Sequence, residues 1–161
     1  MESRWFEFGV VRGIVGAVVG IPIGLYLMKN VHNPITSQGL GVMGSTGFTA
    51  NPSLLIVGAI IGIIITGAIF ELGDWVCRKL EIRANGVWAP IAVGVIGNLV
   101  ATIIALAILS AILIPTNPII ANKVISATLL ALPASLIVEA GYDAITYGIY
   151  KLANWPAPES I

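Results

Sequence analysis

Two carboxylates stand one helical turn apart near the end of the chain, in the segment SLIVEAGYDAITYG at 135–148. Glu139 and Asp143 have the i, i+4 spacing that places two side chains on one face of a helix. Their neighbours are mostly apolar, and carboxylates in such a setting face protein, water or a cation. The pair can therefore share a proton, bind a cation transiently or hold a basic side chain in place.

The composition of the chain predicts that these carboxylates lie in a membrane protein. Of its 161 residues, 57% are hydrophobic and 10% are charged, and the mean hydropathy is +0.97, values far outside the range of soluble domains. Four apolar runs reach the length of about 20 residues that a helix needs to cross a bilayer. Because lipid cannot hydrogen-bond the backbone, helices are the expected spanning form. The runs lie at about 9–28, 53–72, 89–114 and 124–147.

These runs predict an all-α integral membrane protein with four transmembrane helices in a single membrane domain, 1–161. An outer loop would cover about 29–52 and an inner loop about 73–88. One side carries six of the eight lysines and arginines, which are Arg4, Arg12, Arg78, Lys79, Arg83 and Lys151. The same side carries all four tryptophans, Trp5, Trp75, Trp88 and Trp155. Both signals predict a multi-pass protein of the cell membrane with cytoplasmic termini.

Two pairs of short segments suggest an internal repeat. VHNPI at 31–35 matches PTNPI at 115–119, and ELGDW at 71–75 matches EAGYD at 139–143. The arrangement predicts two tandem helical hairpins, and chance similarity in a low-complexity apolar sequence is the alternative. The outer segment ITSQGLGVMGSTGFTA is expected to be an ordinary loop, with a short re-entrant segment as the other possibility.

Small residues recur at four-residue spacing in three of the runs. Such spacing allows membrane helices to approach closely, where lipid offers no hydrophobic gain for pairing. The predicted helix-packing positions are Gly16, Gly20, Gly24, Gly58, Gly62 and Gly97.

The depth of the carboxylates gives two interpretations of their role. At about 1.5 Å per residue, Glu139 lies roughly 22 Å along the last run, with Asp143 closer to the inner boundary. One interpretation is a belt of ion pairs at the inner interface, with Arg12, Arg78, Lys79 or Arg83 as cations. The other is a proton or cation relay in which Glu139 exchanges the ion and Asp143 supports it, either by sharing a cation with Glu139 or by holding Arg78 or Arg83. The candidate relay residues are Glu139, Asp143, Glu71, Asp74 and Asn98.

Other chemistry finds little support in the residues. His32 is the single histidine and falls in the predicted outer loop, and Cys77 is the single cysteine. We therefore expect no catalytic residues, no metal site and no cofactor, so the chain is not expected to be an enzyme itself, although it can be a subunit of one. A net charge of zero with scattered cations gives no surface for nucleic acid.

The tandem hairpins with a carboxylate in the last helix invite comparison with the rotor proteolipids of V-type ATPases. The chain differs from that family in its GxxxG spacing and in its long first loop. The glycine-rich segment GLGVMGSTGF and the short apolar spans resemble the small membrane subunits of energy-converting complexes in methanogenic archaea, such as energy-converting hydrogenases or the sodium-pumping methyltransferase.

Two functions are expected from these features. The first is a non-catalytic membrane subunit of a larger ion-translocating or energy-converting complex, with a possible proton or cation relay through Glu139. The alternative is a self-contained, homo-oligomeric small transporter or channel. The expected partners are membrane lipid and either other integral membrane subunits or further copies of the same chain.

Overall fold

The part of the chain that the structure describes is helical. The computed structural model describes residues 4–30 and 52–161, and the side chains of residues 4–20, 22 and 59–161. The helices are α1 (Arg4–Asn30), α3 (Pro52–Lys79), α4 (Trp88–Thr116) and α5 (Pro118–Leu152). The predicted all-α class is confirmed for these residues, and each of the four apolar runs lies within one helix. The predicted outer loop, with His32 and any re-entrant segment, lies almost wholly outside the described residues.

Three of the described helices are long and apolar enough to cross a membrane. They are the Ala59–Lys79 part of α3, all of α4 and all of α5. The 29 residues of α4 and the 35 residues of α5 extend about 43 and about 52 Å at 1.5 Å per residue, more than the hydrocarbon thickness of about 30 Å. These lengths support the prediction of a multi-pass membrane protein.

The inner connection is shorter than the predicted loop 73–88, because α3 continues to Lys79. The amide of Ile82 donates to the carbonyl of Cys77 at 2.9 Å, and that of Glu81 to Arg78 at 3.3 Å. With Glu81 at a φ of 53°, this is the left-handed helix ending known as the Schellman motif. Basic side chains in the last turn favour this extension through the helix dipole, so a charged sequence that predicts a loop is helical instead.

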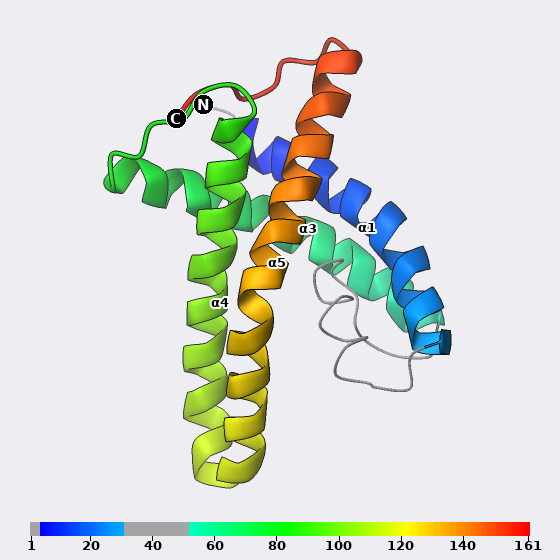
Figure 1. Cartoon of the computed structure of the whole chain (residues 1–161), viewed down its shortest axis with the longest axis vertical. Helices are drawn as coiled ribbons and strands as arrows, with labels where there is room; N and C mark the ends of the chain where they lie inside the picture. Colours follow the sequence, from blue (N-terminus) through cyan, green and yellow to red (C-terminus); the bar gives the residue numbers. More distant parts are fainter. Residues whose placement is uncertain (1–3, 31–51) are drawn as a thin grey trace.

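The turn between α4 and α5 is built from Asn117 and Pro118. The side chain of Asn117 accepts a hydrogen bond from the amide of Ile120 at 3.1 Å, and Pro118 occupies the first position of α5. An asparagine cap followed by proline is an ordinary way to start a helix. The pair therefore lets the chain reverse direction, and α4 and α5 run antiparallel and side by side (Figure 1).

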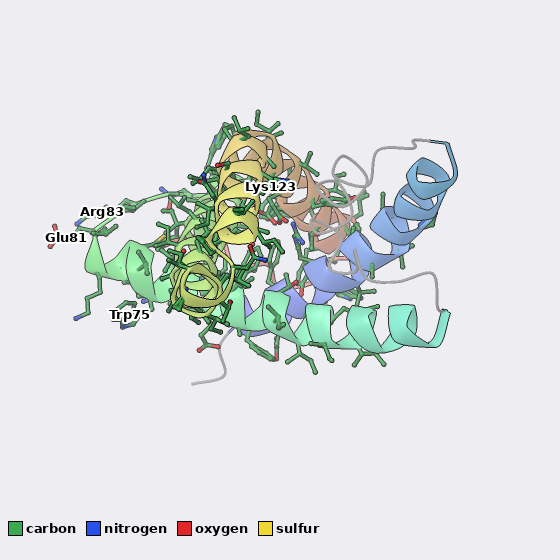
Figure 2. The ribbon with its side chains drawn as sticks, turned by 90° about the horizontal axis from the view of Figure 1, so that it is seen from below. Trp75, Glu81, Arg83 and Lys123 are labelled. Atoms are coloured by element: carbon green, nitrogen blue, oxygen red, sulfur yellow. The ribbon has the colours of Figure 1, made fainter. Side chains whose placement is uncertain are left out.

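The helices are arranged as two crossed pairs. α1 lies along α3, and this pair crosses the α4–α5 pair steeply near the start of α4 and the end of α5 (Figure 1). In the view from below, α4 and α5 are seen nearly end-on while α3 runs across the picture (Figure 2). No described helix lies beside the halves of α4 and α5 that meet at Asn117. These halves expose large apolar side chains such as Ile108, Ile119 and Leu130.

Glycines permit the closest helix contacts, although mostly not the predicted ones. A Cβ atom on Gly9 would lie 2.8 Å from the Cα atom of Gly67, and one on Gly13 would lie 2.9 Å from the Cα atom of Ile63. Gly97 lies directly against Ile69 of α3, with Gly73 against Val93 of α4 in the same interface. Backbone contacts this close require residues without a side chain.

Among the remaining predicted packing glycines, the structure describes a contact only for Gly16. Gly16 is buried, and a Cβ atom there would meet only the Nη1 atom of Arg12 at 3.5 Å. Gly62 is buried and Gly20 is half-buried, whereas Gly24 and Gly58 lie outside the residues whose side chains are described. The closest α1–α3 contacts that the structure describes are at Gly9 and Gly13, and the remaining predicted positions stay predictions.

The hydrophobic core lies at the end of the molecule where both termini are found. Its buried residues are Trp5, Phe8, Phe70, Cys77, Ala89, Val93, Tyr150 and Ala157. Segment 153–161 folds back over the inner connection, where the amide of Gly86 donates to the carbonyl of Glu159 at 2.8 Å and that of Ile161 to Ala84 at 3.2 Å. Trp5 is buried in this core, while Trp75, Trp88 and Trp155 are exposed at the same end. Of the four tryptophans predicted on the inner side, only the latter three are exposed to surroundings such as the membrane interface.

A substitution at Gly9 tests the crossed arrangement. Gly9→Ala is expected to lower the thermal unfolding temperature in mild detergent, because its Cβ atom would meet backbone atoms of Thr66 and Gly67 at a cost of about 1–3 kcal/mol. Gly141→Ala is the matched control, since nothing lies within 4 Å of a Cβ atom there, and it is expected to be neutral or stabilising. Equal behaviour of the two variants would show that α1 does not contact α3 as described.

Candidate functional site

Arg12 of α1 lies between the two carboxylates of α5. Its Nη2 atom contacts Oε2 of Glu139, and its Nε atom donates to Oδ1 of Asp143 at 3.1 Å. The side chains of Arg12, Glu139 and Asp143 are 4%, 9% and 0% exposed. We call this buried group of three charged side chains the Arg12 triad.

Local structure brings each member of the Arg12 triad into place. The i, i+4 spacing in α5 puts Glu139 and Asp143 on one face, as the sequence predicts. Arg12 reaches that face from α1 because the crossed helices bring the first half of α1 against the second half of α5 (Figure 1). The Cζ atom of Arg12 also lies 5.3 Å from the ring centroid of Tyr142, a cation–π contact that helps to orient the guanidinium.

α4 completes the site through a polar and a small residue. The Nδ2 atom of Asn98 donates to the carbonyl of Gly94 at 3.0 Å and to Oε2 of Glu139 at 3.3 Å. Gly94 contacts the carboxylate of Asp143 directly, and a Cβ atom at that position would collide with it and lie 2.9 Å from the ring of Phe70. The absence of a side chain at Gly94 therefore creates the space that Asp143 fills.

One oxygen of Asp143 is left without a donor. Oδ2 is fully buried and accepts no hydrogen bond from any described residue, although it lies against Gly94. A buried ionised oxygen without a donor is costly, because it loses hydration and gains nothing in return. This oxygen is the position in the triad where a proton would relieve the greatest cost.

The charges of the Arg12 triad do not balance. One guanidinium faces two carboxylates, so the fully ionised triad carries a net charge of −1. Burial makes a net charge expensive, whereas a proton or cation added to the site would cancel it. The arrangement can therefore take up and release one positive charge.

The other predicted site residues lie outside the triad. Glu71 is exposed on α3, and Asp74 pairs with Arg78 of the same helix at 2.9 Å. The prediction that Arg78 or Arg83 holds Asp143 is wrong, because Arg12 occupies that role. The helical extension of α3 keeps Arg78 beside Asp74. Arg83 lies just beyond the C-terminal end of α3 (Figure 2). Lys151 pairs with Glu159 of the C-terminal segment.

Two residues of the site were not among the predicted relay residues. Arg12 was grouped with the cations of the inner side, although it falls inside an apolar run, where an ionisable residue is itself a signal of function. Gly94 gave no such signal. A residue without a side chain is required there only because α4 packs against α5 at Asp143. Among the described residues, no group of three or more histidine, cysteine or acidic side chains could hold a metal ion.

Comparisons of the chain with protein-family models, with curated proteins and with solved structures gave no match. The resemblance to membrane subunits of archaeal energy-converting complexes therefore stays a prediction. The Arg12 triad and the surface of the helices around it are therefore the features that bear on function.

Removal of Arg12 tests whether the triad holds α1 to α5. Arg12→Gln would leave two carboxylates buried without their cation, and we expect the free energy of unfolding to fall by about 3–5 kcal/mol. Arg78→Gln is the matched control, because it removes an arginine from an ion pair whose side chain is 58% exposed, and it should cost less than about 1 kcal/mol. Unfolding in mixed detergent micelles measures both. A loss for Arg12→Gln no larger than that of the control would contradict the buried pairing.

Proposed function

We propose that the chain is a non-catalytic, multi-pass subunit of a larger ion-translocating membrane complex, and that its Arg12 triad relays a proton or cation, with Glu139 as a required member. The observation that carries this proposal is the buried site of one arginine and two carboxylates. Ionisable groups inside membrane helices are expensive, and such a group is by default a candidate for a place on an ion pathway.

The unequal charges favour a relay over a purely structural ion pair. A structural pair needs one carboxylate for one guanidinium, and the second carboxylate adds a buried charge that only weakens the fold. Such a charge has a use when the site must alternate between two states that differ by one positive charge. Asp143 with its unpaired Oδ2 and Glu139 with its two partners on α1 and α4 provide unequal positions for that exchange.

The surface of the helices supports assembly with other subunits. Large apolar side chains of α4 and α5 are exposed along their length, among them Ile104, Ile112 and Ile137, and polar mass beyond the helices is small. Lipid can cover part of this surface, and helices of partner subunits can cover the rest. In the crossed arrangement, the halves of α4 and α5 near Asn117 extend beyond the α1–α3 pair and offer both helices to a neighbour (Figure 1).

The proposal includes α1 as a fourth span and the two pairs as tandem hairpins, with both termini on the cytoplasmic side. α1 has 27 residues, or about 40 Å, which is sufficient to cross a bilayer. Spanning helices tilt by up to about 40°, so two pairs that tilt in opposite directions can cross steeply while both span. The exposed tryptophans Trp75, Trp88 and Trp155 would then lie at the cytoplasmic interface.

A homo-oligomeric transporter or channel is the second candidate. The exposed apolar faces of α4 and α5 favour it to the extent that a second copy of the chain can cover them. Purification in mild detergent, with identification of all co-migrating chains, separates the two functions. Other membrane proteins in fixed proportion support the subunit, and copies of this chain alone support the oligomer.

Ion-coupled flux tests the relay directly. Glu139→Gln keeps the shape of the side chain and removes its charge, so we expect it to abolish ion-coupled flux in vesicles reconstituted with the purified assembly, without changing the subunit composition. Glu71→Gln is the matched control, because it removes an exposed glutamate outside the Arg12 triad, and its flux should equal that of the unaltered protein. Full flux in Glu139→Gln vesicles would mean that the triad is only a structural ion pair.

A further inference from the structure

We infer that Asp143, and not the deeper Glu139, carries the exchangeable proton of the Arg12 triad, with its hydroxyl at Oδ2 against Gly94. This inference rests on the proposed relay and names the atom at which the relay is loaded. It differs from the expectation based on depth along α5, which favours Glu139 as the exchanging group. Three features of the site point to Asp143: the partners of each carboxylate, the burial of each carboxylate and the charge of the whole site.

The two carboxylates have unequal sets of partners. Oε2 of Glu139 lies against the positively charged Nη2 atom of Arg12 and accepts a hydrogen bond from the side-chain amide of Asn98. Asp143 receives only the Nε atom of Arg12, at Oδ1. Donors that point at a carboxylate stabilise its ionised form. Glu139 is therefore the better-stabilised anion, and a proton shared between the two groups belongs on Asp143.

Burial points to the same residue. Asp143 is 0% exposed, and its Oδ2 atom is enclosed by Gly94 of α4 beside the ring of Phe70 of α3. Neither neighbour offers a hydrogen-bond donor to this oxygen. An ionised oxygen there would be unsolvated, whereas a neutral hydroxyl avoids the burial of a charge. Protonation of Asp143 also brings the triad from a net charge of −1 to zero.

The charged and titratable groups around Asp143 leave a proton as the simplest added charge. Arg12 faces it from α1, and Glu139 and Tyr142 lie on α5 within one turn of it. From α4 the uncharged Gly94 lies against Asp143, and the uncharged ring of Phe70 of α3 lies beside Gly94. A metal cation would have to sit beside the fixed positive charge of Arg12, which repels it, while a proton adds to Oδ2 without displacing the guanidinium.

The exchange is a simple ionisation of a carboxylic acid. On release, the O–H bond at Oδ2 of Asp143 breaks, the electron pair stays on the oxygen, and the proton passes to water or to an acceptor group of the translocating assembly. The single positive charge of Arg12 then faces both Glu139 and Asp143, so the triad carries a net charge of −1, and rebinding of a proton restores the neutral triad. Glu139 is a positioning residue in this scheme, because it holds Arg12 beside Oδ1 and leaves Oδ2 free.

This scheme explains why loss of Glu139 would also stop the relay. In Glu139→Gln the single guanidinium faces a single carboxylate, so the triad is neutral with Asp143 ionised and gains nothing from a proton. Comparison of Glu139→Gln with Asp143→Asn therefore cannot show which carboxyl carries the proton, and the test has to identify the acid by isotope.

The infrared C=O stretch of a protonated carboxyl provides that test. The chain contains only two aspartates, Asp74 and Asp143. The full chain carrying Asp74→Asn, purified in mild detergent at neutral pH, therefore has a single aspartate. We expect a protonated-carboxyl band that moves to lower frequency when the aspartate side-chain carboxyl is labelled with carbon-13, and that stays in place when the glutamate side chains are labelled. Asp143→Glu in the same background should transfer the shift to the glutamate label.

Two results would overturn the inference. One is a band that moves with the glutamate label while Asp143 is intact, and the other is the absence of a protonated-carboxyl band at neutral pH. The band reports the position of the proton whether or not vesicles show flux. Loss of the proposed function, seen as flux that does not depend on Glu139, is therefore distinguishable from failure of this inference.

Discussion

A positive charge buried inside a membrane protein must be neutralised where it lies, and the guanidinium of Arg12 meets this requirement with Glu139 and Asp143. The requirement fixes the position of α1 against α5, although the two helices are far apart in the sequence. It also requires α4 to present Gly94 where a side chain would fill the space of the carboxylate, and Asn98 where Glu139 needs a second donor.

The packing of the helices follows from the same close approach. Gly9 and Gly13 bring α1 onto α3, and Gly73 and Gly97 bring α3 onto α4, so that the three helices and α5 converge beside the triad. The aromatic core, in which the ring of Phe8 contacts those of Phe70 and Tyr150, lies at the end that holds both termini. On the other side α4 and α5 continue alone among the described helices (Figure 1).

The sequence predicted the parts of this structure that depend on local pattern. Apolar runs of bilayer length located the helices, and the i, i+4 spacing placed Glu139 and Asp143 on one face of α5. The partner of Asp143 could not be predicted in this way, because it depends on the crossing of helices that are distant in the chain. Proximity along the predicted inner side favoured Arg78 and Arg83, but the longer α3 keeps Arg78 with Asp74.

Long-range packing also decides the remaining differences. Tryptophan is a typical residue of the membrane interface, yet α1 places Trp5 in the core. The ring centroids of Trp5 and Phe8 lie 6.4 Å apart there. The four-residue spacing of small residues is present at many positions of the apolar runs, and only the helix crossing selects Gly9, Gly13 and Gly94 among them. Spacing identifies faces that permit close contact, and packing between distant parts of the chain decides which of these faces meet.

The central claim is that the charge of Arg12 and the charges of Glu139 and Asp143 stabilise the fold only in each other's presence. The most direct measurement is the free energy of unfolding of three proteins in mixed detergent micelles: Arg12→Gln, the Glu139→Gln and Asp143→Asn double variant, and the variant with all three changes. Buried partners are expected to show a coupling energy of about 1–3 kcal/mol, so the triple variant should lose less stability than the other two losses added together. Losses that simply add would contradict the account, because they would mean that Arg12 does not pair with these carboxylates.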